Sequence, residues 1–135
     1  MQTEFSKNVF VVRLFPGINT EIISHIIKEK NLKGIILETY GSGNATTSAK
    51  FIDAIKGAVE KGIVVVNVSQ CSGGVVEMEK YENGLQLKRA GVISAHDMTS
   101  EAAITKLMFL LGTKRKISEV KMLMQQSLAG EMNGE

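Results

Sequence analysis

The sequence predicts an α/β domain of Rossmann-like, three-layer architecture, with a roughly four-stranded parallel sheet flanked by helices. Short β-branched runs alternate with longer stretches of helical periodicity, as in a succession of β-α-β units. The run 63–68 is apolar in character, as expected for a strand covered by helices on both faces. A length of 135 residues and a hydrophobic content of 44% suit one domain with a substantial core, and a second domain does not fit.

The first β-α unit is predicted from a strand over 9–14, which ends at the turn Phe15-Pro16-Gly17. A helix then runs to Lys30, capped by Asn19 or Thr20. Its apolar face is expected to consist of Ile22, Ile23, Ile26 and Ile27.

The second unit repeats this pattern. A strand is predicted over 34–39, and a helix follows over about 47–61. Gly62 is the expected stop signal of that helix, and the third strand comes directly after it over 63–68.

The last third of the chain is predicted to add a short helix over 85–90, a fourth strand over 91–94 and a helix capped by Thr99. A final helix is expected over 117–129, after a core region that spans 8–112.

Charge and cysteine content exclude several kinds of partner. The 16 basic and 14 acidic residues leave a net charge of +2, too small to indicate nucleic acid or an anionic membrane. The single cysteine, Cys71, cannot form an internal disulfide, and no Cys/His spacing typical of a metal site occurs. We therefore expect no metal, no cofactor and a reducing, cytoplasmic setting.

The turn that follows the strand 34–39 is the first candidate for a ligand site. It reads Gly41-Ser42-Gly43-Asn44, and ligands of open parallel sheets bind beyond the carboxyl ends of the strands. The Asn44 amide has both a donor and an acceptor, so it can orient a ligand, but it cannot act as acid, base or nucleophile near pH 7. The other interpretation of this segment is a plain strand-to-helix turn.

Groups able to carry out catalysis are scarce. Cys71, His96 and Asp97 are the only set that resembles a nucleophilic triad, and nothing in the sequence places the histidine within reach of the thiol. Tyr81 and Asn83 lie where a loop can reach a second domain or subunit, although turn formation explains Asn83 as well. His25 and the basic cluster 114–116 are interpreted as solvated. We expect no catalytic residue in this chain.

Five ordered motifs together resemble the C-terminal domain of bacterial type I L-asparaginases. They are Leu37-Glu38-Thr39-Tyr40-Gly41-Ser42-Gly43-Asn44-Ala45, Val64-Val65-Val66-Asn67-Val68-Ser69-Gln70-Cys71, Tyr81 with Gly84, Gly91-Val92-Ile93-Ser94, and Asp97-Met98-Thr99 with Glu101-Ala102-Ala103 and Thr105-Lys106-Leu107. The resemblance runs from about Val9 to Gly112 and continues more weakly through the last helix.

The resemblance implies a function in amino acid metabolism. Members of this family hydrolyse L-asparagine to L-aspartate and ammonia without a cofactor, and a larger N-terminal domain carries the threonine nucleophiles. The threonine motifs of that domain, Thr-Gly-Gly-Thr and His-Gly-Thr-Asp-Thr, do not occur here, so residues 1–135 are expected to be the C-terminal domain alone, inactive in isolation. In the family this domain completes the active site of a neighbouring subunit of a homodimer or tetramer, and the residue that it contributes corresponds to Asn44.

The resemblance also implies an allosteric asparagine site that involves Cys71. Allosteric members have an arginine at the position that Glu38 occupies here. An anion at this position is expected to repel a ligand carboxylate instead of pairing with it.

Two alternatives stay open. One is the asparaginase-like subunit of a glutamyl-tRNA amidotransferase, which has an equivalent domain. The other is an amino-acid-binding regulatory module that senses its ligand through the Asn44 and Cys71 loops.

Overall fold

Four parallel strands form one sheet in the computed structural model, which describes residues 8–14, 19–28, 31–39, 49–69, 82–95 and 98–126. The strands are β1 (Val9–Arg13), β2 (Gly34–Thr39), β3 (Val64–Ser69) and β4 (Ile93–Ser94). Their order in the sheet is β1-β2-β3-β4, so neighbours in sequence are neighbours in space. The predicted four-stranded parallel α/β fold is confirmed.

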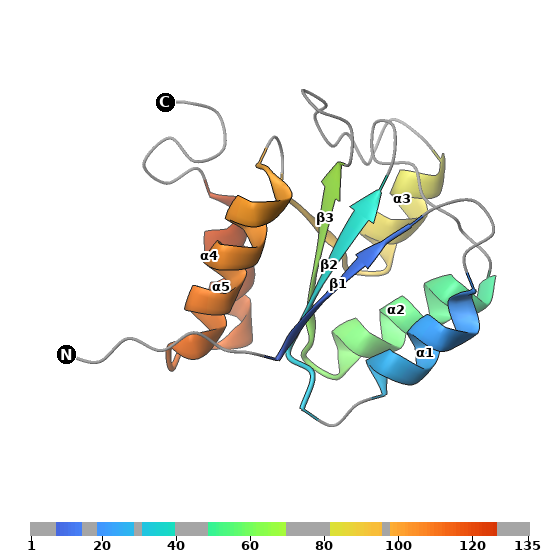
Figure 1. Ribbon diagram of the computed structural model, residues 1–135, viewed down its shortest axis with the longest axis horizontal. Helices are drawn as coiled ribbons and strands as arrows, with labels where there is room; N and C mark the ends of the chain where they lie inside the picture. The colour runs from blue at the N-terminus through green and yellow to red at the C-terminus, as the bar shows by residue number, and fades with distance from the viewer. Residues whose placement is uncertain are drawn as a thin grey trace.

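Two helical layers cover the sheet (Figure 1). One layer contains α1 (Thr20–Ile27), α2 (Ala49–Glu60) and α3 (Glu82–Arg89), and the other contains α4 (Ser100–Gly112) and α5 (Ile117–Gln125). Each connection between parallel strands in this order passes over the same face, because such crossovers are almost always right-handed. The chain reaches the second face only after β4.

Strand alternation divides the core into two clusters. On the face of α1, α2 and α3, Ile35, Leu37 and Val65 pack against Phe51 and other helix residues. On the opposite face, Ile36 and Val66 of the same strands belong to a cluster with α4 and α5. The sheet is therefore buried on both faces, as the apolar strands predicted.

Local signals explain several helix ends. The Asn19 side chain accepts a hydrogen bond from the Glu21 amide at 2.9 Å, and the Thr99 hydroxyl accepts one from the Ala102 amide at 3.1 Å. Gly62 follows α2 with a φ of 96°, a conformation that residues with a Cβ seldom adopt. Of the two caps predicted for α1, Asn19 or Thr20, Asn19 is the one observed, and the predicted cap Thr99 and stop at Gly62 are confirmed.

Some boundaries differ from the prediction. The helix α1 ends at Ile27 instead of Lys30, and α3 begins at Glu82, three residues before its predicted start. Helix α5 ends at Gln125, because Gln126 is extended, with φ of −87° and ψ of 144°. The positions from 127 to 129, which were also expected to be helical, lie outside the described residues.

Ile22, expected on the apolar face of α1, is exposed, and so is the apolar residue Ile117 at the start of α5. Ile22 is 57% exposed and Ile117 is 38% exposed, whereas Ile23, Ile27 and Val120 are buried. Both residues are in the first turn of a short helix. The buried face of such a helix is narrower than the set of its apolar residues suggests.

Candidate functional site

The carboxyl ends of β1, β2 and β3 meet at one edge of the sheet, because the strands are parallel and in register. Arg13, the last residue of β1, lies beside Glu38 of β2, and Thr39 lies beside Ser69 of β3. Alternation along β2 sends the side chains of Glu38 and Thr39 to opposite faces of the sheet. Glu38 shares the face of Ile36, which α4 and α5 cover, whereas Thr39 shares the face of Leu37.

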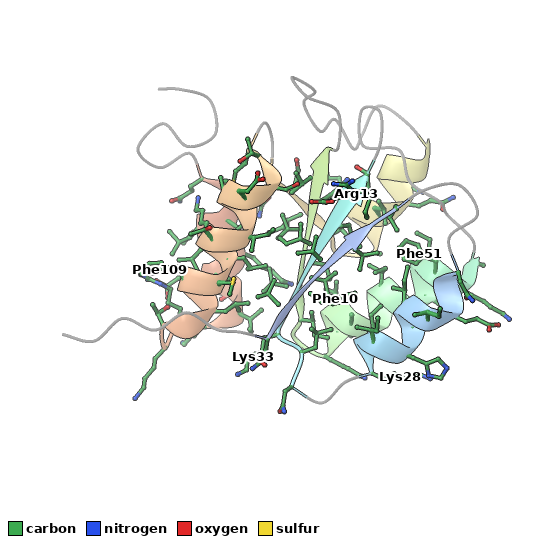
Figure 2. The ribbon with its side chains drawn as sticks, in the orientation of Figure 1. Phe10, Arg13, Lys28, Lys33, Phe51 and Phe109 are labelled. Atoms are coloured by element: carbon green, nitrogen blue, oxygen red, sulfur yellow. The ribbon has the colours of Figure 1, made fainter. Side chains whose placement is uncertain are left out.

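An ion pair links β1 and β2 on the α4 side of this edge. The Nε of Arg13 donates to Oε1 of Glu38 at 3.0 Å. The Glu38 side chain is 10% exposed and the Arg13 side chain is 71% exposed. The guanidinium is therefore largely in solvent, while the carboxylate is mostly buried. Figure 2 shows Arg13 at the carboxyl end of β1, with Lys33 at the opposite edge of the sheet.

The ion pair with Arg13 changes the charge that Glu38 presents to a ligand. The expected repulsion of a ligand carboxylate assumed an isolated anion at this position. The Arg13 guanidinium balances that charge at the same edge and presents further N–H groups to solvent. Whether an allosteric ligand binds here stays a prediction, and a ligand carboxylate would meet the Arg13 guanidinium as well as the Glu38 carboxylate.

A second polar pair links β2 and β3 on the other face. The Thr39 hydroxyl donates to Oδ1 of Asn67 at 2.9 Å, and both side chains are completely buried. The Nδ2 of Asn67 has no hydrogen-bond partner among the described residues. Buried amide donors nearly always have acceptors, so this atom is unusual.

A groove of about 870 Å³ runs between α4 and α5. Phe109 and Leu123 provide apolar lining, while Arg115 and Glu119 form an ion pair at 3.3 Å. Lys106, 8% exposed, donates from Nζ to the Gln126 carbonyl oxygen at 3.0 Å. This bond ties the end of α5 to α4, so we interpret the buried lysine as structural.

Several residues predicted to form the site lie outside the described residues: Asn44, Cys71, Tyr81, His96 and Asp97, together with the side chain of Asn83. Their roles stay predictions. His25 is exposed, as are all three residues of the basic cluster 114–116, which confirms the solvated interpretation.

Sequence reasoning did not identify Arg13, Thr39 or Asn67 as residues of this edge. A signal existed for Asn67, since it is the one polar residue between Val64 and Val68. Arg13 and Thr39 acquire their partners through strand register, which the sequence pattern does not reveal.

The described residues do not indicate a metal site or a membrane segment. No three His, Cys, Asp or Glu side chains within the described ranges come close enough together to hold a metal ion. Among the helices of that part of the chain, none has the length and apolar character needed to cross a bilayer.

The parallel sheet with helices on both faces places the chain in the class of open α/β domains, whose ligands, where they have them, bind beyond the carboxyl ends of the strands. Its sequence narrows the class further, because residues 8–124 match the family model described as the glutaminase/asparaginase C-terminal domain. The chain belongs to this family.

Individual relatives agree with this assignment. The chain is 39% identical over 122 residues to L-asparaginase 1 of Escherichia coli K12, covering 90% of this chain and 36% of that protein. It is also 39% identical over 129 residues to a subunit of the glutamyl-tRNA(Gln) amidotransferase of Pyrococcus abyssi, covering 96% of this chain and 29% of the relative.

The crystal structure of L-asparaginase I from Vibrio cholerae superposes with a TM-score of 0.89 at 41% identity, covering 96% of this chain and 39% of that one. The chain thus spans little more than a third of the length of these asparaginases.

Proposed function

We propose that this chain acts as the C-terminal domain of an L-asparaginase, in which Asn44 completes the active site of a neighbouring subunit. The observation that carries the proposal is the family match over residues 8–124, combined with a span of only 36% of the E. coli relative. A domain of this family is expected to work with the remainder of such an enzyme.

The residue chemistry supports a contributing role. Asn44 comes five residues after Thr39, the last residue of β2, and so follows directly from the carboxyl edge. Its amide can accept a hydrogen bond from a substrate ammonium group and can donate one to a carboxylate. It has no proton to transfer near neutral pH, so we assign Asn44 to substrate positioning and not to the reaction chemistry itself.

The proposal includes L-asparagine as substrate, a homodimer or tetramer as the working assembly, and a cytoplasmic setting. The asparaginase relatives support the substrate. A single cysteine agrees with a reducing compartment.

A chimeric enzyme tests the proposal. Residues 1–135 replace the matching segment of E. coli L-asparaginase 1, and hydrolysis of L-asparagine is measured with and without Asn44→Ala. We expect the chimera to be active and Asn44→Ala to lower kcat/KM by roughly 10- to 150-fold, because a lost bond to a charged substrate group costs about 1.5 to 3 kcal/mol. Full activity of a folded, oligomeric Asn44→Ala chimera would contradict the assigned role.

The isolated chain provides a second test. At high protein concentration it is expected to release no ammonia from L-asparagine above a buffer blank, because its sequence lacks the threonine motifs Thr-Gly-Gly-Thr and His-Gly-Thr-Asp-Thr of the N-terminal domain. Measurable turnover by the purified 135-residue chain would place catalytic groups within it.

A second candidate function has its own support, since the identity to the P. abyssi amidotransferase subunit is also 39%. In that function the domain serves an enzyme that delivers ammonia to a glutamyl-tRNA. To compare the two candidate functions, residues 1–135 replace the matching segment of the P. abyssi protein, and ammonia transfer to charged tRNA is measured. Higher relative activity in this second chimera would favour the amidotransferase.

A further inference from the structure

Basic side chains gather at the amino ends of the strands, on the opposite side of the sheet from the carboxyl edge. Lys28 follows α1, Lys33 precedes β2 and Lys61 follows α2, and all three are exposed. In a succession of parallel β-α-β units, helix ends and strand starts lie at the same edge. Figure 2 shows Lys28 and Lys33 at this amino edge, away from Arg13.

The exposed basic segment 114–116, between α4 and α5, extends this surface. Helix α4 ends at the amino edge, because a Cβ on Gly34, the first residue of β2, would lie 2.9 Å from the side chain of Leu111. Helix α5 begins there, because a Cβ on Gly62 would lie 4.0 Å from the side chain of Ile117. The segment 114–116 is therefore close to the end of α2.

These residues form a surface that we call the basic edge, which consists of Lys28, Lys33, Lys61, Lys114, Arg115 and Lys116. Within the described ranges, the acidic residues that adjoin it in sequence are Glu60 and Glu119, and Glu119 pairs with Arg115 at 3.3 Å. None of the lysines of the basic edge forms an ion pair with a carboxylate of the described residues.

The charge of the chain is thus unevenly distributed. Glu21 and Glu101 lie in the first turns of α1 and α4, which begin at the carboxyl edge. The net charge of +2 is a sum over both edges, and it gave no reason to expect nucleic acid. The distribution of charge is the more informative quantity, and it is strongly positive at the amino edge.

Stability of the helices explains only part of the basic edge. Lys28 and Lys61 follow helix C-termini, where a cation is favourable. Lys116 is instead the N-cap of α5 and has no side-chain cap hydrogen bond, at a helix end that disfavours a cation. Lys33 serves the sheet through its main chain, since its amide donates to the Asn8 carbonyl oxygen at 2.8 Å. An anionic partner would account for both side chains.

The composition of the edge indicates which anion suits it. Lysine is depleted at protein–protein interfaces and is a common ligand of phosphate. The described aromatic residues Phe10, Phe51 and Phe109 pack with the two core clusters, so they offer no platform for unstacked bases. Ile117, 38% exposed, provides little apolar area for insertion into a bilayer. These features favour the phosphates of a double helix.

We propose that the basic edge binds the phosphate backbone of a double-stranded nucleic acid without reading its sequence. Each lysine that reaches a phosphate releases a condensed counterion, so salt weakens the complex. The first N–H groups of α5 add the positive end of a helix dipole to the same surface. The inference goes beyond the proposed function and does not depend on it, because the edge proposed to serve the substrate is the carboxyl edge.

Binding is tested by fluorescence anisotropy with the complete 135-residue chain and a labelled DNA duplex of about 20 base pairs. We expect a Kd of about 1 to 100 µM at physiological salt, similar for two unrelated sequences. The logarithm of the association constant should fall with the logarithm of salt concentration with a slope of about −4, close to one for each lysine–phosphate contact. A slope near zero, or no binding at about 50 mM salt, would overturn the inference.

Charge reversal locates the surface. Lys33→Glu combined with Lys61→Glu should weaken binding at least about tenfold and bring the slope closer to zero by about two. Lys50→Glu combined with Lys56→Glu is the matched control, because both lysines are exposed on α2 before its last turn and the net charge changes equally. We expect this control to weaken binding less than about threefold. Equal weakening by the two pairs would show that overall charge holds the duplex, which contradicts the proposal.

Circular dichroism checks that each variant is folded. If the charge-reversed pair does not fold, Lys33→Gln combined with Lys61→Gln replaces it, with Lys50→Gln combined with Lys56→Gln as control. Competition at equal charge concentration then compares the duplex with its single strand, with polyglutamate and with phosphatidylserine vesicles. We expect the duplex to bind most tightly. Tighter binding of any competitor would assign the basic edge to that class of partner and reject the double helix.

Discussion

Charge at a single position is a poor guide to the electrostatics of the carboxyl edge. Glu38 alone suggests an anionic edge, yet the register of β1 and β2 brings Arg13 to 3.0 Å from it. The two residues are 25 positions apart, so no local pattern connects them. A ligand that approaches this edge meets a guanidinium as well as a carboxylate.

We expect Arg13→Gln to lower the free energy of unfolding by less than about 1 kcal/mol, because the Arg13 side chain is 71% exposed and water screens its charge. Urea denaturation measures this. Arg115→Gln, which breaks the exposed pair with Glu119 on α5, provides a matched baseline. A loss above about 2 kcal/mol for Arg13→Gln alone would mean that the pair is an anchor of the fold.

What the sequence revealed at the residue scale was local. The caps Asn19 and Thr99 and the stop at Gly62 depend on neighbours within a few positions, and each was predicted. The pair Thr39 and Asn67 depends on two strands aligning, and it was missed. Asn44, predicted from its turn at the carboxyl edge and from the family resemblance, stays a prediction, as does the allosteric role of Cys71, which the resemblance alone implies.

At the scale of elements, secondary structure followed from apolar periodicity, and boundaries followed less well. The strand β2 was predicted to the residue, while α3 began earlier than expected. Tertiary packing decides such ends, as where the buried Lys106 holds the carbonyl of Gln126 beyond α5.

The N-cap residues of α4 and α5 differ, because only that of α4 accepts a side-chain hydrogen bond from the helix. This difference leads to a paired prediction. Thr99→Ala should lower the free energy of unfolding by about 1 kcal/mol, because the Ala102 amide loses its acceptor. Lys116 has no side-chain cap bond, so Lys116→Ser should raise stability by about 0.5 to 1 kcal/mol. Thermal and urea unfolding measure both, with Thr99→Ser as the control that keeps the hydroxyl. Equal stability of Thr99→Ala and the parent chain would refute the cap.

The packing at the junction between α3 and β4 is tested at Gly91, with Gly57 of α2 as the matched control. Gly91 has a φ of 103°, and a Cβ there would lie 2.7 Å from Cγ1 of Val59. Gly91→Ala should therefore cost about 2 kcal/mol or more. Gly57, inside α2, has open space around it, so Gly57→Ala should stabilise by about 0.5 to 1 kcal/mol. Unfolding curves in which both substitutions act alike would contradict the described packing.

At the scale of the whole molecule, the strand order bears on function. Open α/β sheets usually bind ligands where the strand order reverses, since the two neighbouring loops diverge and leave a crevice. The four described strands run in sequential order with no reversal. This strand order agrees with the proposed function, in which the domain completes a site formed with another polypeptide.

Two chimeras of E. coli L-asparaginase 1, each impaired in a different part of the proposed site, test that account most directly. One carries Asn44→Ala in this chain, and the other carries alanine for the nucleophilic threonine expected in the bacterial N-terminal domain. After the subunits are mixed and reassociated, half of the dimers contain one intact site, so about a quarter of the parent activity should return. A mixture no more active than its two components, although mixed dimers form, would contradict a site shared between subunits.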